Sequence, residues 1–407
     1  MKKFKKNFIW NTLGTCTNAF SSLFFMITVT RINGLNDAGI FTIAFSTACI
    51  IYIVGLYAGR IYQVTEPNKL ITNKEYIFHK IITVFIMLVF VILFCIIREY
   101  NAFKTTVFIL LTGYKAIEAF SESIYGILQK NENLDKVGKS LLLKSLTAIL
   151  LFILINYITK NLIFSIVIII LTSIVITIFY DIRITKKYID IKSKLDRIHI
   201  FNIFKYGFFT FIISFLGMYI QSAPKYSIDS YLKGEFQTIF GIIVMPATVM
   251  ALFAQFLIHP FLNKILNVYE DNNFKELNKI IYGLVLLIFI FGAVSSMLAY
   301  FIGPEIIGFV YGIELDLYRV NLLIIIIAAT LYTIGFIYSS ILITIRDTFS
   351  QFIIYIILSI FALIVSNVLT KNYQVNGATY AYFLIMLLQF IIYTIYTNLK
   401  LKKIKKI

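Results

Sequence analysis

Long, predominantly apolar stretches follow one another along the whole chain, separated by short polar segments. A bilayer requires roughly 17 to 25 such residues for each helical span. Because lipid offers no partner for free backbone groups, and because the alternating pattern of a membrane barrel is missing, we expect these stretches to be helices. The pattern predicts about twelve spans, near residues 8–30, 39–64, 77–97, 104–128, 138–158, 161–180, 204–222, 235–259, 280–302, 319–345, 350–370 and 376–398.

The composition supports the same class of protein. Of the 407 residues, 59% are hydrophobic and only 14% are charged, which is typical of an integral membrane protein. A soluble protein with a very large core is the alternative, but apolar runs such as residues 162–180 lack the amphipathic spacing of a soluble helix. The predicted fold class is therefore an all-α polytopic membrane protein.

Three charged residues interrupt the fourth predicted span, namely Lys115, Glu118 and Glu122. One charge at the centre of a bilayer costs about 2.5 to 3.5 kcal/mol on insertion scales, so the row requires water or partners. On a helix these positions fall within a stripe roughly 60° wide, which Tyr125 and Gln129 extend toward one end. One face of this span is therefore expected to avoid lipid, and its charges mark a candidate functional site.

Lysine and arginine are concentrated in alternate loops and in both terminal tails, which places both termini in the cytoplasm. The first span, with its basic tail, is typical of an uncleaved signal anchor. The net charge of +17 could suggest nucleic acid, but these cations are spread over short loops beside the spans. We expect them to contact anionic membrane lipids rather than nucleic acid.

The longest basic interruption lies near the middle of the chain and divides it into two halves. We predict an N-terminal six-helix lobe over 1–181, a basic amphipathic cytoplasmic linker over 182–203 and a C-terminal six-helix lobe over 204–407. Apolar residues of the linker recur every three or four positions, which favours an interfacial helix over a plain solvated loop. A similar stretch, residues 260–279, occupies the corresponding loop of the second half. Because both halves begin on the same side, any internal repeat is parallel.

The sequence offers little support for an enzyme. The cysteines and histidines are not spaced as metal ligands, no phosphate-binding glycine loop is present, and we expect neither a metal nor a cofactor. The longest predicted outer loop, near residues 303–318, is short and has acidic residues without an evident nucleophile and base. Catalytic residues are therefore not predicted.

Several segments resemble bacterial polysaccharide flippases of the Wzx type, which belong to the multidrug, oligosaccharidyl-lipid and polysaccharide exporter superfamily. The resemblance rests on Asn7-Phe8-Ile9-Trp10-Asn11, on Arg31-Ile32-Asn33-Gly34 with Asp37-Ala38-Gly39-Ile40-Phe41, and on Lys115, Glu118, Ser121, Gly126, Gln129, Asp135, Ser140 and Lys144. It implies two six-helix lobes around a central cavity in the bacterial cytoplasmic (inner) membrane. It also implies transport of undecaprenyl-pyrophosphate-linked oligosaccharide repeat units, for capsule or O-antigen assembly, alongside a polysaccharide polymerase and glycosyltransferases.

Such a cargo has a hydrated anionic head that cannot cross hydrocarbon alone, so its transporter must supply a polar furrow. A pyrophosphate requires cations, for which Lys115 and Lys144 are the expected pair, with Arg60 nearer the cytoplasmic mouth. The remaining candidate cavity residues are polar or aromatic side chains of the same and neighbouring spans: Glu118, Glu122, Asn11, Asn18, Tyr206, Tyr219 and Gln221.

Other interpretations stay open at this point. Lys115 and Glu118, three residues apart, are able to neutralise one another, and Glu122 is able to pair with Lys144, which would give these charges a structural role. A cation-coupled drug exporter or a lipid II flippase of the same superfamily is the second functional hypothesis. The drug exporter would need an acidic site for a cationic cargo, which Glu118 and Glu122 are able to supply. A polysaccharide polymerase or ligase is the third.

Overall fold

Helices form the regular structure of the chain. A computed structural model describes residues 2–66, 70–190 and 193–405, and the elements in those ranges are α-helices with short 3-10 and π turns. Contacts divide the chain into two compact units, Met1–Phe215 and Leu216–Ile407. We call them the first unit and the second unit. The boundary falls inside one helix, α9 (Arg197–Tyr231), later than the predicted start of the second lobe at residue 204.

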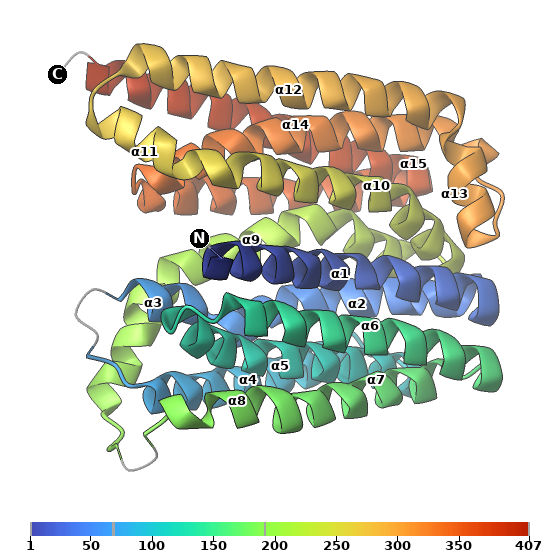
Figure 1. The fold of residues 1–407 in the computed structure, drawn as a ribbon. Helices are drawn as coiled ribbons and strands as arrows, with labels where there is room; N and C mark the ends of the chain where they lie inside the picture. The colour runs from blue at the N-terminus through green and yellow to red at the C-terminus, as the bar shows by residue number, and fades with distance from the viewer. Residues whose placement is uncertain (1, 67–69, 191–192, 406–407) are drawn as a thin grey trace. The chain divides into compact units, whose positions relative to one another are not determined.

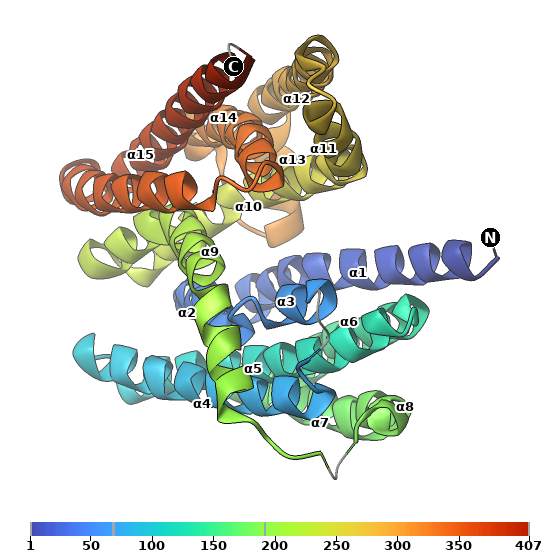
Figure 2. The same cartoon turned by 90° about the vertical axis from the view of Figure 1, so that its left-hand side faces the viewer.

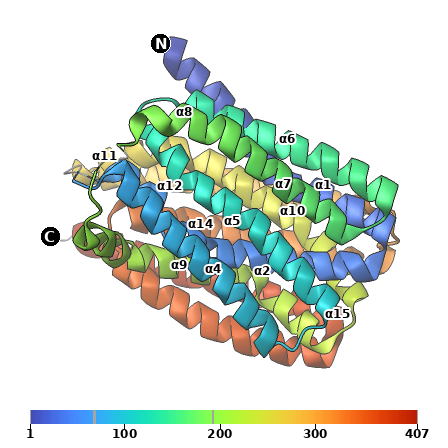
Figure 3. The same ribbon diagram turned by 90° about the horizontal axis from the view of Figure 1, so that it is seen from below.

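The first unit is built around α5 (Ala102–Lys130). Helices α2, α3, α4 and α7 all pack on α5, and α4 and α7 flank it in Figure 3. Helix α1 packs mainly against α6, and the helices of this unit are coloured blue to green in Figure 1. The other elements of this unit, before α9, are α1 (Lys2–Asn33), α2 (Leu35–Leu56), α3 (Gly59–Thr65), α4 (Asn73–Ile97), α6 (Leu134–Thr159), α7 (Leu162–Ile176), the π turn η1 (Thr177–Ile182), α8 (Arg183–Thr185) and η2 (Lys186–Tyr188).

Small residues bring α1 and α6 into close contact. A Cβ atom added to Gly14 would collide with the backbone of Gly138, and one added to Gly138 would collide with the backbone of Trp10. In lipid, the hydrophobic effect does not drive helices together, so their association depends on van der Waals packing. Small residues allow the close backbone approach that such packing requires.

In the second unit, α14 (Arg319–Thr344) packs against α10 (Gly234–Ile258), α12 (Phe274–Phe301) and α15 (Thr348–Lys405). Gln374 has non-helical backbone angles, so α15 consists of two helices that meet at a bend, visible in Figure 2. The remaining elements are η3 (His259–Phe261), α11 (Leu262–Glu270), α13 (Gly303–Tyr311) and η4 (Asp316–Tyr318).

An ion pair joins the two helices of α15 at their open end. Lys400 Nζ lies 2.7 Å from Asp347 Oδ2, and Tyr396 donates a hydrogen bond of 3.0 Å to the same carboxylate. Burial opposes ionisation of Asp347, but the hydrogen bonds from Lys400, Ser350 and Tyr396 lower its pKa below the ordinary value. The carboxylate therefore stays ionised and holds the two ends of α15 together.

The predicted fold class is confirmed. Within the described residues, ten helices are long and apolar enough to cross a membrane, and α15 accounts for two of the predicted spans. Helix α5 is absent from that set although it is long, because its apolar sequence is interrupted by the charged row. With these two adjustments the helices correspond to the predicted spans.

The predicted amphipathic helix over 182–203 is not a single helix. Residues 183–188 form only two short turns, 193–196 are irregular, and α9 begins at Arg197; residues 191–192 lie outside the described part of the chain. Side chains of α4 hold this segment instead: Asn73 Nδ2 donates to the Tyr188 carbonyl at 2.9 Å, and Lys74 Nζ donates to the Ser193 carbonyl at 2.7 Å. Carbonyls bound in this way are not available for a continuous helix.

The second predicted span, 39–64, is broken rather than continuous. Tyr57 and Ala58 adopt left-handed angles, with φ of 40° and 54°, and separate α2 from α3. Lys80 of α4 is 1% exposed, and its Nζ donates to the carbonyls of Gly55 at 2.8 Å and Leu56 at 2.7 Å. A buried ammonium group therefore satisfies carbonyls that the end of α2 leaves without helical partners.

We predict that Lys80→Met loosens this break. Loss of a buried hydrogen bond costs about 1 to 3 kcal/mol, so amides of residues 55–62 are expected to exchange with deuterium about tenfold faster or more. Peptide-resolved hydrogen exchange on the detergent-purified protein measures this. Lys233→Met, at an exposed position of the second unit, is the control. Unchanged exchange in the Lys80 variant would contradict this role.

Candidate functional site

The charged row of α5 is the centre of a polar network inside the first unit. Lys115 Nζ lies 2.7 Å from Glu118 Oε2, as their spacing of three residues predicts. Asn18 of α1 donates to Glu118 Oε1 at 3.0 Å, and Ser145 of α6 donates to Asn18 Oδ1 at 3.2 Å. The structure thus brings together three of the predicted site residues, from α1 and α5.

Glu122, one helical turn along α5, pairs with Arg60 of α3. Arg60 Nη1 lies 2.9 Å and 3.2 Å from the two carboxylate oxygens, and Arg60 Nε donates to Gln129 Oε1 at 3.0 Å. The guanidinium also lies over the Tyr125 ring, 5.8 Å from its centroid. The break after α2 makes this possible, since α3 packs on α5 after the change of direction.

Lys144 of α6 pairs with Asp181 of η1 rather than with Glu122. The Nζ to Oδ2 distance is 2.6 Å, and Lys144 also donates to Ser121 Oγ at 2.7 Å. The alternative pairing of Glu122 with Lys144 is therefore wrong, because each residue has a nearer partner. Asp181 was not predicted, although an acid that directly follows an apolar run was a signal for it. It lies in a π turn, a distortion found often at functional sites.

The three ion pairs differ in exposure. The Asp181 side chain is 0% exposed and that of Lys144 10%, whereas the Arg60 side chain is 24% exposed and that of Glu122 17%. Lys115 lies between these limits at 12%. An external anion is therefore able to reach Arg60 most easily, while Lys144 and Asp181 belong to the interior.

Aromatic rings surround the Lys115 ammonium. Its Nζ lies 5.3 Å from the centroid of Phe45, 5.5 Å from that of Tyr52 and 5.9 Å from that of Tyr114. Such contacts stabilise a cation that has left water. Lys115 is thus held by one carboxylate and by ring faces from α2 and α5.

Other predicted residues lie outside this network. Tyr206, which is 59% exposed, stacks on Tyr62 with centroids 5.9 Å apart, and Asn11 is partly exposed on α1. Tyr219 and Gln221 belong to the second unit. Tyr219 stacks on Tyr226, and Gln221 donates to the Tyr332 hydroxyl at 3.2 Å. Their role in a cavity stays a prediction.

The second unit has a different polar character. Its sequence has no charged residue over 236–258, 280–301, 320–344, 349–370 or 375–399. Tyr332, Gln221 and neighbouring tyrosines supply neutral hydrogen-bonding groups, and ion pairs such as Arg319 with Asp316 lie near helix ends. Within these five stretches the second unit therefore has only neutral polar side chains, whereas the spans of the first unit contain ion pairs.

The structure resembles solved transporters over nearly its whole length. An inward-facing multidrug resistance MATE family transporter of the MOP superfamily matches with a TM-score of 0.72 and 14% identity, over 97% of this chain and 96% of that chain. The lipid II flippase MurJ in an inward closed conformation matches with a TM-score of 0.74 and 15% identity, over 96% and 87% of the two chains. The chain has the fold of MOP-superfamily transporters. It is a multi-pass membrane protein.

The sequence comparison adds a relative with the same extent. The chain is 25% identical over 384 residues to the capsular polysaccharide biosynthesis protein CapF of Staphylococcus aureus. The aligned region covers 92% of this chain and 94% of that protein. No protein-family model matches the chain. In this chain the polar network of α5 lies inside the first of the two units.

We predict that Lys144→Met destabilises the protein by about 3 to 5 kcal/mol, because it leaves the Asp181 carboxylate buried without a partner. The double variant Lys144→Met with Asp181→Leu is expected to recover most of that loss, since a buried pair can be replaced by apolar residues at little net cost. Thermal unfolding of the detergent-purified protein measures both effects.

The matched control is Lys3→Met, which removes the exposed pair of Lys3 with Glu132 and is expected to change stability by less than about 1 kcal/mol. Equal destabilisation by Lys144→Met and by the double variant would show that Asp181 does not depend on Lys144.

Proposed function

We propose that this protein is a flippase. Its cargo would be undecaprenyl-pyrophosphate-linked oligosaccharide repeat units, moved by alternating access across the bacterial cytoplasmic membrane for capsule or O-antigen assembly. The observation that carries the proposal is that two cations, Arg60 and Lys115, lie partly exposed inside an apolar helical unit. The relative named for capsular polysaccharide biosynthesis supports the same cargo.

A pyrophosphate head needs donors that match several oxygens at once. Arg60 provides a planar fork of donors, and two of its nitrogens already bind oxygen atoms of Glu122 and Gln129. In this proposal the phosphate oxygens replace Glu122 as the partner of Arg60. Lys115, which lies on the same face of α5 as Glu122, gives a second positive charge. The polyprenyl tail needs no such cover, because it remains in lipid.

The paired charges make the cargo site reversible. Each cation of the network has a carboxylate partner in the empty protein, so an incoming anion gains only the difference between its own interaction and that of the carboxylate it replaces. A transporter must release its cargo on the other side, and a site of this kind allows release without a large energy cost.

Uncharged polar side chains in the second unit are of a kind that binds sugars. Tyrosine rings and the amide of Gln221 are able to stack on sugar faces and hydrogen-bond hydroxyl groups without fixing a charge. Orientation follows from the distribution of lysine and arginine, with both termini in the cytoplasm. A polysaccharide polymerase and glycosyltransferases are the expected functional partners.

A drug exporter for cationic cargo is the competing function, and the fold is shared with such transporters. Within the described part of the network, Glu118, Glu122 and Asp181 all have a lysine or arginine within 3 Å. A cationic drug would have to displace a lysine or arginine, just as an anionic cargo has to displace a carboxylate. The pairing therefore weighs equally on both cargoes, and the relative named for capsular polysaccharide biosynthesis favours the anionic one.

We predict that deleting the gene in its native host causes lipid-linked oligosaccharide to accumulate and surface polysaccharide to disappear. Complementation with Arg60→Ala or Lys115→Ala is expected to restore less than about a tenth of the surface polymer, because the phosphate loses a charge-assisted contact. Arg60→Lys is expected to give an intermediate level, since it keeps the charge but loses the planar fork. Surface polymer and lipid-linked intermediates are measured together, with protein levels checked by immunoblot.

Lys233→Ala, at an exposed position, is the matched control and should complement fully. Normal surface polymer with Arg60→Ala and Lys115→Ala at normal protein levels would contradict the assigned site. Normal polymer in the deletion strain together with new sensitivity to cationic dyes would favour the drug exporter.

A further inference from the structure

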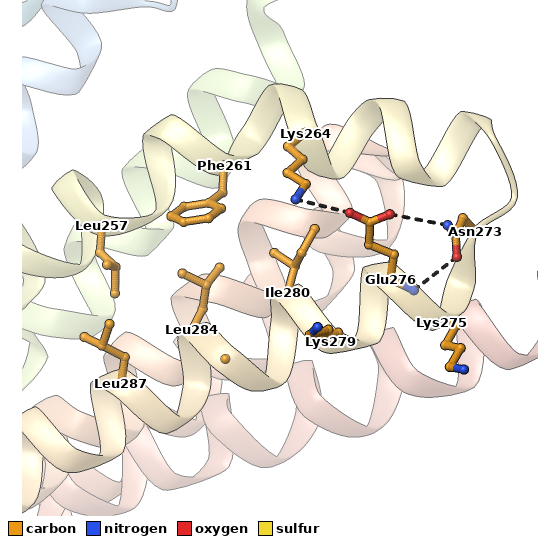
Figure 4. Close-up of a pocket in the computed structure, with 11 residues that line it drawn as sticks. Leu257, Phe261, Lys264, Asn273, Lys275, Glu276, Lys279, Ile280, Leu284 and Leu287 are labelled. Carbon is orange, nitrogen blue, oxygen red and sulfur yellow. Dashed lines mark hydrogen bonds and ion pairs between the residues drawn. The ribbon is translucent and has the colours of Figure 1, made fainter.

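A pocket of about 560 Å³ opens in the second unit at the turn between α11 and α12 (Figure 4). Its floor is apolar and is formed by Leu257, Phe261, Ile280, Leu284 and Leu287. Lys264, Lys275, Lys279 and Glu276 line its other end. The pocket therefore has one end suited to hydrocarbon and one end suited to an anion.

At the polar end, the single acid is already neutralised. Lys264 Nζ of α11 lies 3.1 Å from Glu276 Oε1 of α12, as the dashed line in Figure 4 shows. Asn273 donates to the other carboxylate oxygen at 3.3 Å and accepts from the Glu276 amide at 3.1 Å. These bonds satisfy Glu276 and connect α11 to the first turn of α12.

Two further lysines line the pocket and leave it with an excess of positive charge. Lys275 and Lys279 are both exposed, and no ion pair of either is found within residues 2–66, 70–190 and 193–405. The acidic residues Glu270 and Asp271, at the end of α11, do not line the pocket. An anion bound here would therefore meet two ammonium groups with no competing carboxylate except the neutralised Glu276.

The apolar floor continues onto an exposed apolar surface of α12. Leu287 is 43% exposed, and its neighbours Leu286 and Tyr282 are 58% and 61% exposed. The rise along α12 from Lys279 to Leu287 is about 12 Å, most of the roughly 15 Å depth of hydrocarbon in one leaflet. Gly283 lines the pocket between these positions, and a Cβ atom added there would meet nothing within 4 Å. The groove thus has open space along the direction of an acyl chain.

We propose that this groove binds one anionic glycerophospholipid of the predicted cytoplasmic leaflet. Its phosphate lies between Lys275 and Lys279, and one acyl chain runs past Gly283 toward Leu287. A soluble anion would gain nothing from the apolar floor. A zwitterionic lipid would bring its own cation close to Lys275 and Lys279, which would repel it. The site lies within the second unit and does not depend on the proposed cargo.

Native mass spectrometry of the detergent-purified protein, titrated with phosphatidylglycerol or phosphatidylcholine, tests this proposal. Each lysine near a membrane surface favours an anionic lipid by roughly fivefold, so the two together predict a preference of about thirtyfold for phosphatidylglycerol. The double variant Lys275→Gln with Lys279→Gln is expected to remove that preference. Gly283→Phe, which fills the groove, is expected to abolish the tight binding of both lipids.

Matched controls separate this site from general attraction. Lys402→Gln with Lys403→Gln removes the same charge from the exposed end of α15, and Gly283→Ala adds only a methyl group to open space; both should bind phosphatidylglycerol as the parent does. The exposed lysine variants are expected to fold normally, so the test does not depend on Gly283→Phe alone. Equal loss with the Lys402 and Lys403 variant, or equal affinity for phosphatidylcholine, would overturn the proposal. Displacement by undecaprenyl phosphate at concentrations below those at which phosphatidylglycerol binds would overturn it as well, and would assign the groove to a polyprenyl lipid.

Discussion

A charged side chain inside an apolar span is stable only when another charge or a strong hydrogen-bonding group lies against it. The first unit is organised by this constraint. Helix α5 carries Lys115, Glu118 and Glu122, and their partners come from α1 and α3 as well as from α5 itself. Lys144 and Asp181 add a third pair between α6 and η1, connected to α5 through Ser121. Removing any one of these charges changes the contacts of more than one helix, so packing and charge balance in this unit are inseparable.

The break between α2 and α3 connects this network to the rest of the chain. It directs α3 against α5, which places Arg60 beside Glu122. The same break is the docking point for the start of α9, where Phe211 stacks on Tyr57 with centroids 4.5 Å apart. In many transporters the carbonyls at the end of a broken helix bind a coupling cation. Here the amino group of Lys80 already donates to those carbonyls, so a side chain of the protein occupies the position.

Hydropathy predicted the spans because their length is set by the bilayer, a constraint that acts on each stretch independently. The pairing of Lys115 with Glu118 was also accessible, since residues three apart share a helix face. The partners of Glu122 and Lys144 were not, because they depend on how α3 and η1 return to α5. Gly55 and Gly59 on either side of the break were the available signal for it, but the apolar pattern continues through Tyr57 and Ala58 without interruption. The linker was wrongly predicted as one helix because Asn73 and Lys74, distant in sequence, bind its carbonyls.

The two units differ in the charged side chains within their spans. A parallel repeat of two similar helical lobes would not require such a difference. Three ion pairs join α3, α5, α6 and η1, whereas residues 236–258, 280–301, 320–344, 349–370 and 375–399 of the second unit have no charged side chain and rely on tyrosine, glutamine and serine. A small cationic drug has no use for lysine and arginine on α3 and α5. The cations of α3 and α5, rather than the shared fold, are therefore the structural argument for an anionic cargo.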